Sequence, residues 1–258
     1  MMSTSLVISL VTVTVVISVP APDTDNDLPS PLATDIDTLD KLFQDYFQWK
    51  ASTYPFWATS ENIDGYDDLV NDYSPDRFRT RAVQCREFLT RSKNLQADSH
   101  DNELYQKIFE SEVAACADGD KINNWFAPVN VMENVAVDIP RLIEKTPLDS
   151  IRDYENLLSR LQKVPDMIRQ IKDVLRMGIK EGATYAKESM KGVDAAFEKL
   201  QVGAEQSVFY AKFRDMSGSL GRRVVDRLQT TAYNLTENEI LPAFLDLQEF
   251  LRYAKSNK

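Results

Sequence analysis

The sequence contains a single histidine, His100, and this limits the hydrolytic chemistry that its residues can perform. A Ser-His-Asp or Cys-His hydrolase needs a base that titrates near neutral pH, and that base is usually histidine. A helical zinc peptidase needs two histidines four residues apart, so that both imidazoles face the metal. His100 lies between Asp98 and Asp101 without a nucleophile motif, which is typical of an exposed loop. We therefore predict no catalytic residue, no bound metal and no cofactor within these 258 residues.

Carboxylates offer a second kind of chemistry, the binding of a hard cation. The segment 62–65, Asn-Ile-Asp-Gly, resembles the middle of a calcium-binding EF-hand loop. With Gly65 at the sixth position, Ser60 and Asn71 would occupy the first and twelfth, where an Asp and a bidentate Glu are expected. A high-affinity EF-hand is therefore not predicted. The alternatives are a solvated acidic turn and weak, diffuse cation binding by Asp64, Asp67, Asp68 and Asp72.

Acidic residues are concentrated in one part of the chain. The net charge is −10, from 30 basic and 40 acidic residues. The segment from Asp23 to Asp76 holds 13 acidic residues against Lys41 and Lys50, a local charge of −11. Because no basic face is available to neutralise phosphates, a nucleic-acid partner is not predicted. One hypothesis is that the acidic segment attracts calcium or a basic surface, as in an acidic matrix or mineral-associated protein.

Two cysteines, one glycosylation sequon and one aromatic cluster are further candidate sites. Cys85 and Cys116 could form a disulfide in an oxidising compartment, or could be two small buried thiols on neighbouring helices. Asn234 begins the only sequon, which secretion would make usable. A cluster of aromatic side chains could line a pocket for an apolar or sugar ligand, or could seal a core: Tyr54, Phe56 and Trp57.

The N-terminus is predicted to be a secretory signal peptide. Leu6 to Val19 is an uncharged apolar run, too short to span a bilayer, and Pro20-Ala21-Pro22 follows it. No transmembrane segment is predicted. We expect a signal peptide over 1–21, with cleavage after Ser18 as the alternative, then a flexible acidic linker over 22–34 and a helical domain over 35–258. A buried β-strand is the alternative interpretation of the run, because Val, Ile and Thr favour strands.

Helical periodicity and only eight glycines predict an all-α fold built from antiparallel helical hairpins. The first helix is expected over 35–52, with Leu39, Leu42, Phe43 and Tyr46 facing inward. Ser74-Pro75-Asp76 signals the start of a helix that continues to about Arg91. A third helix is expected over 102–117, with Leu104, Ile108 and Val113 facing inward, and then an irregular loop over 123–131.

The C-terminal half is predicted to begin with a helical hairpin. Thr146-Pro147 would start its first helix, with Ile151, Tyr154, Leu158 and Leu161 on one face, and Val164-Pro165 would end that helix and start the next. After residues 182–184 we expect a helix through Leu200 and two more between Ala204 and Tyr253. Pro242 should kink or divide the last of these.

Several short motifs occur in order along the chain: residues 54–59, 64–69, Ser74-Pro75, 153–155, Arg160-Leu161, Pro165, Gly178, 182–184, 241–244 and 250–251. Together they resemble the domain-of-unknown-function family 885 (DUF885), whose members are similar to helical zinc metallopeptidases of the carboxypeptidase type. The resemblance covers about residues 35–253, but only the N-terminal portion of a family member. It implies a helical scaffold and a secreted, peptidase-like ancestry. The family's zinc motif lies beyond the position of Lys258, so no catalytic residue is transferred to this chain.

Three functional hypotheses follow. The first is a secreted, extracellular, non-catalytic scaffold that binds an unknown protein or an extracellular-matrix partner, and the second is a fragment of an active secreted zinc metallopeptidase. The acidic matrix protein described above is the third. If part of the family fold is missing, apolar helix faces should be exposed, and self-association through the C-terminal helices is predicted at Phe244, Leu247 and Leu251.

Overall fold

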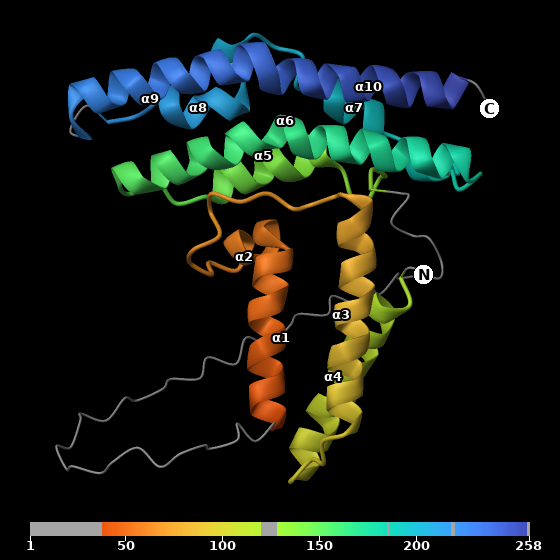
Figure 1. Ribbon diagram of the computed structural model, residues 1–258. Coiled ribbons are helices and arrows are strands. Elements are labelled where there is room, and N and C mark those ends of the chain that lie inside the picture. The colour runs from red at the N-terminus through yellow and green to blue at the C-terminus, as the bar shows by residue number, and fades with distance from the viewer. Residues whose placement is uncertain (1–37, 120–127, 185, 218–219, 257–258) are drawn as a thin grey trace, which may run out of the picture. The chain divides into compact units, whose positions relative to one another are not determined.

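The computed structural model describes residues 38–119, 128–184, 186–217 and 220–256, and these are helical without any strand (Figure 1). The predicted all-α class is confirmed. The predicted signal peptide and linker, and most of the loop predicted over 123–131, lie outside the described residues. Within the described parts, no helix is both long enough and apolar enough to cross a bilayer.

The N-terminal helices begin where local capping rules place them. Helix α1 (Leu39–Thr53) follows Thr38, whose hydroxyl accepts a hydrogen bond from the Lys41 amide at 3.2 Å. A short helix α2 (Pro55–Ser60) comes next. Helix α3 (Pro75–Lys93) starts at the predicted Ser74-Pro75 signal, with the Ser74 hydroxyl accepting from the Arg77 amide at 3.3 Å. The predicted starts of α1 and α3 are therefore correct to within a few residues.

Helix α4 (His100–Ala117) lies beside α3, but its buried face differs from the predicted one. Val113 is buried as expected, whereas Leu104 and Ile108 are 53% and 57% exposed. The inward positions are Phe109, Val113 and Ala117, spaced four residues apart. The Phe109 ring packs 5.2 Å from Phe43 and 5.1 Å from Tyr46, measured between ring centroids, and this contact decides which face turns inward.

Helix α5 (Val135–Lys145) was not predicted, and its presence changes the interpretation of Thr146. Val135, Ile139 and Ile143 are buried at helical spacing, although Pro140 lies inside the helix. Thr146 caps the end of α5, and its hydroxyl donates to the Leu142 carbonyl at 2.8 Å. The prediction that Thr146-Pro147 starts a helix is therefore wrong.

Helix α6 (Ile151–Lys180) begins after Ser150 and continues through Pro165, so the predicted hairpin is wrong. Ser150 and Asp153 form a capping box at its start. Proline removes one backbone donor and crowds the preceding turn. However, Leu161, Val164 and Ile168 on either side are buried, and this packing keeps the helix continuous.

The remaining chain forms shorter helices and one long rod. In order they are the 3₁₀ turn η2 (Lys187–Met190), α7 (Val193–Glu198), the 3₁₀ turn η3 (Ala204–Gln206), α8 (Val208–Arg214), α9 (Arg222–Leu235), the π-helical turn η5 (Thr236–Ile240) and α10 (Leu241–Ser256). The helix expected through Leu200 is thus limited to α7. Pro242 was expected to kink or divide a helix, but it lies in the first turn of α10, directly after the π turn, and α9, η5 and α10 run on without a break (Figure 1).

The C-terminal rod packs against α6, and this contact buries residues predicted to be exposed. Phe244 and Leu247 are fully buried in the core formed with α6, α8 and α9, and Leu251 is partly buried against the same core. The Phe244 ring stacks on Phe209 at 5.2 Å. The prediction that these residues are exposed is wrong, while self-association through the C-terminal helices stays a prediction.

Candidate functional site

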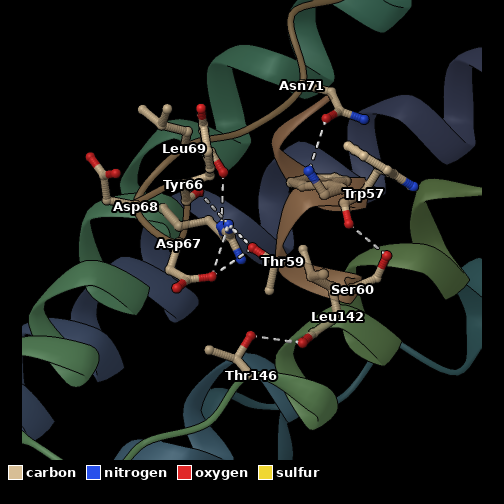
Figure 2. A network of polar contacts seen from close by, with 12 residues as sticks. Trp57, Thr59, Ser60, Tyr66, Asp67, Asp68, Leu69, Asn71, Leu142 and Thr146 are labelled. Carbon is tan, nitrogen blue, oxygen red and sulfur yellow. Dashed lines mark hydrogen bonds and ion pairs between the residues drawn. The ribbon is translucent and has the colours of Figure 1, made fainter. Parts of the chain in front are cut away.

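A buried arginine on α6 holds the acidic loop that follows α2. The Arg160 side chain is 1% exposed. Its Nε donates to the Leu69 carbonyl at 2.8 Å, and its Nη2 donates to the Tyr66 carbonyl and the Thr59 hydroxyl, both at 2.6 Å. Asp67 accepts from the same Thr59 hydroxyl and lies 3.8 Å from Nη2. We call Arg160 with these four residues the Arg160 clasp (Figure 2).

Three of the four carboxylates that could have bound a cation, those of Asp67, Asp68 and Asp72, already have partners within the protein. Burial lowers the pKa of Arg160 to about 10, and Asp67 and Asp68 act in the opposite direction. Lys163, one turn further along α6, contacts the Asp68 carboxylate at 3.1 Å and donates to its carbonyl at 2.6 Å. Asp72 accepts from the Ser74 amide at 2.8 Å. Across the described ranges, no group of three or more His, Cys, Asp or Glu side chains is placed to hold a metal ion.

A cavity of 460 Å³ lies between the loop after α2, helices α3 and α4, and the start of α5. Its aromatic walls come from Tyr54, Phe56 and Phe78, and its polar groups include Arg81, Glu133 and Asp138. The volume is within the usual range for small-molecule sites, about 300–1,000 Å³. Tyr54 and Phe56, two of the three aromatic residues that could either line a pocket or seal a core, line this cavity.

Arg81 is the charged group buried most deeply in the cavity wall. It is 8% exposed, and its guanidinium lies 4.9 Å from the Tyr54 ring centroid and 4.8 Å from that of Phe78. Nη2 donates to the Asp72 carbonyl at 2.5 Å. Nε has no hydrogen-bond partner, and no carboxylate of the described chain lies within ion-pair distance of the guanidinium. Burial lowers the pKa of Arg81, since desolvation disfavours its charged form.

Two carboxyl groups from a later part of the chain, those of Glu133 and Asp138, line the same cavity. Glu133 is exposed at the rim, and its pKa is raised by desolvation and by the negative charge of Asp138. Asp138 lies in the first turn of α5 and accepts a hydrogen bond from the Asn134 amide at 2.9 Å. Burial also raises the pKa of the Tyr73 hydroxyl, which experiences the charges of Glu133, Arg81 and Asp138. The cavity therefore brings one cation and two anions close to a single hydroxyl.

The raised pKa of Glu133 predicts a pH-dependent contribution to stability. Its folded-state pKa exceeds the unfolded value, so its contribution is fully present below the unfolded pKa and is lost as pH rises through the folded pKa. Glu133→Gln should therefore be slightly more stable than the wild type near neutral pH and should gain less stability on acidification. Urea unfolding from about pH 4 to about pH 7 measures this difference. Glu144→Gln, on an exposed position of α5, is the control, and parallel pH profiles for wild type and Glu133→Gln would contradict the prediction.

Cys85 on α3 and Cys116 on α4 are joined in the structure. Their sulfur atoms lie 2.00 Å apart and their Cα atoms 5.9 Å apart. Cys116 also lines the cavity, and Arg81 lies one helical turn before Cys85. The covalent link therefore fixes two helices of the cavity wall to each other.

A second hollow of 350 Å³ adjoins Trp57, the third residue of the predicted aromatic cluster, and its charges are satisfied internally. Lys50 contacts Glu112 at 2.7 Å and lies 4.8 Å from the Trp57 ring centroid. The Tyr46 hydroxyl donates to Glu112 at 2.9 Å, and burial and Glu112 together raise its pKa. Because Lys50 and Glu112 already pair with each other in this hollow, the Arg81 cavity is the stronger candidate site.

Neither His100 nor Asn234 lines either of these two cavities. His100 is the exposed first residue of α4, 3.8 Å from the Glu103 carboxylate. Asn234 is exposed on α9, but the hydroxyl-bearing Thr236 of its sequon is fully buried in the π turn. Glycosylation of Asn234 stays a prediction, and it would require the sequon to be recognised before this helix forms.

Neither Arg81 nor Arg160 was predicted to be a site residue, although each lies close in sequence to a buried apolar residue. Arg81 precedes the buried Cys85 by four residues on α3, and Arg160 is adjacent to the buried Leu161 on α6. An arginine at an inward helical position is rarely buried unless it is paired.

Comparisons with known proteins agree with the motif resemblance. The family model described as "Bacterial protein of unknown function (DUF885)" matches residues 55–258. A crystal structure of a presumed lipoprotein from Colwellia psychrerythraea has a similar fold, with a TM-score of 0.72 at 16% sequence identity. The match covers 84% of this chain and 41% of that protein, so the chain spans less than half of its length. No curated protein sequence matches significantly.

Proposed function

Because the chain belongs to the DUF885 family, we propose that its described helices form a secreted, non-catalytic binding scaffold, and that the Arg81 cavity is its binding site. The observation that carries the proposal is a buried guanidinium without a carboxylate partner in the wall of a cavity of ligand size. Buried charges in folded proteins are normally paired. A buried charge that has no partner and faces a cavity therefore favours a binding site in that cavity.

A secreted location has three supports. The apolar run from Leu6 to Val19 has the length of a signal-peptide core. The structure contains a disulfide, which persists mainly in oxidising compartments. The structural neighbour is described as a presumed lipoprotein, a class of envelope protein.

A second candidate is that these residues are part of a longer secreted zinc metallopeptidase. The observation in its favour is that the chain spans 41% of its structural neighbour. The intact mass of the natural protein after deglycosylation separates the candidates, since a mass well above 29.4 kDa favours the longer peptidase. The acidic matrix hypothesis has less support, because Arg160 and Lys163 already engage Asp67 and Asp68.

The binding proposal is tested by blocking the cavity. Ala115 is exposed on α4 and lines the cavity, so Ala115→Trp should fill it without removing a charge. A thermal-shift screen of small molecules against the full chain should identify compounds that stabilise the wild type and lose this effect in Ala115→Trp. Ser111→Trp, one turn earlier on α4 and also exposed, is the control and should keep the effect.

Two results would overturn the proposal. Compounds that stabilise wild type and Ala115→Trp equally would show that the cavity is not the binding site. Stoichiometric zinc together with chelator-sensitive peptide hydrolysis would show that the scaffold is catalytic.

A further inference from the structure

The chemistry of the Arg81 cavity defines the class of ligand that fits it. Resting on the binding function proposed above, we infer that the ligand is a small zwitterion with an apolar body, of the type of a free aromatic amino acid. Its carboxylate would lie at Arg81, its ammonium at Glu133 and Asp138, and its apolar group against the aromatic wall.

The negative end of the ligand is set by Arg81. Its guanidinium is held by the Asp72 carbonyl and two ring faces, none of which carries a full negative charge. The other deeply buried arginine is placed differently, since Arg160 has three oxygen acceptors and Asp67 at 3.8 Å, although its Nη1 is also unsatisfied. Thus the fold supplies a carboxylate near Arg160 but none in ion-pair contact with Arg81. Arg81 is therefore available to the carboxylate of a ligand.

The positive end of the ligand is set by Glu133 and Asp138. The Asp138 charge and desolvation both disfavour ionisation of Glu133, so a cation bound between them would relieve a cost present in the empty cavity. No basic side chain of the described residues is in ion-pair contact with Glu133. An ammonium group is the appropriate cation, because two carboxylates alone do not complete a metal site.

The charge balance argues against simpler ligands. With one arginine and two acids, the cavity walls carry a net negative charge that would repel phosphate or a dicarboxylate. A simple amine would satisfy the acids but leave Arg81 unpaired. Tyr54, Phe56 and Phe78 supply apolar surface between the charged groups, which favours a ligand with an aromatic or aliphatic side chain.

Isothermal titration calorimetry of the full chain tests the inference, with L-phenylalanine as the probe. Two analogues each lack one charge: 3-phenylpropanoate has no ammonium, and 2-phenylethylamine has no carboxylate. We expect L-phenylalanine to bind and each analogue to bind at least about tenfold more weakly, because each loses hydrogen bonds to a charged group.

Variants assign the two ends of the ligand. Glu133→Gln should weaken binding of L-phenylalanine about tenfold while leaving that of 3-phenylpropanoate unchanged or tighter. Arg81→Met should weaken binding of both carboxylates but not of 2-phenylethylamine. Glu144→Gln is the matched control and should change none of these affinities. If Arg81→Met does not fold, the Glu133→Gln comparison alone decides.

The failures of the two proposals are distinguishable. Equal affinities for L-phenylalanine and either analogue would overturn the zwitterion inference. The zwitterion inference is also overturned if L-phenylalanine does not bind to the wild type. If Ala115→Trp nevertheless abolishes the binding of another compound, the proposal that the cavity is a binding site still holds. If Ala115→Trp leaves every bound compound unaffected, the binding function itself fails and the inference fails with it.

Discussion

Arg160→Met should lower the free energy of unfolding by about 3–5 kcal/mol, because it removes one partner of a buried, hydrogen-bonded charge. Methionine keeps much of the apolar contact but removes donors to the Leu69 and Tyr66 carbonyls and to the Thr59 hydroxyl. It also leaves the Asp67 carboxylate without its buried cation. Because Tyr66, Asp67 and Leu69 lie in the loop after α2, the loss of these contacts should release the loop from α6.

The measurement is urea unfolding of wild type and variant, followed by circular dichroism. Arg169→Met is the matched control on the same helix, because Arg169 is 70% exposed and pairs with Asp166 at the surface. It should cost less than about 1 kcal/mol. A loss for Arg160→Met no greater than that of the control would show that the clasp does not stabilise the fold.

Local rules predicted the parts of the fold that depend on a few neighbouring residues. The caps at Ser74 and the helical spacing of Leu39 and Leu42 act within one or two turns, so the sequence alone reveals them. These features were predicted correctly because the interactions that set them lie within one or two turns of the chain.

Distant contacts decided the features that were predicted wrongly. Pro165 should end a helix by its local chemistry, but burial of α6 on both sides outweighs the loss of one hydrogen bond. Leu104 and Ile108 are apolar at helical spacing, yet the face with Phe109 and Val113 is buried because Phe43 and Tyr46 lie opposite it. Neither outcome can be read from one helix considered alone.

The candidate site was the least predictable part of the protein. Arg81 lies far from Glu133 and Asp138 in the sequence, and the cavity arises only when α3, α4 and α5 pack together. Charged residues are also abundant in the sequence, so only the packing of the helices shows which of them line one cavity. The aromatic cluster at 54–57 was the one local signal of this site.

Loss of the link between Cys85 and Cys116 should produce the second large effect. The two residues are 31 positions apart, and closing a loop of this length in the unfolded chain corresponds to about 3–4 kcal/mol by loop-closure entropy. Cys85→Ala combined with Cys116→Ala should therefore lower the free energy of unfolding by about that amount, and a reductant should do the same to the wild type.

The chain provides its own control for this prediction, since it contains only these two cysteines. Adding reductant should destabilise the wild type but have no further effect on the double variant. An unchanged unfolding midpoint for the wild type in reductant would contradict a stabilising disulfide. The disulfide joins α3, which carries Arg81, to α4, which carries Ala115. Loss of the disulfide should therefore also lower the affinity of the cavity for any ligand that binds there. Cavity binding and the disulfide should therefore be lost together under reducing conditions, and a binding affinity that is unchanged by reductant would show that the two helices keep their positions without it.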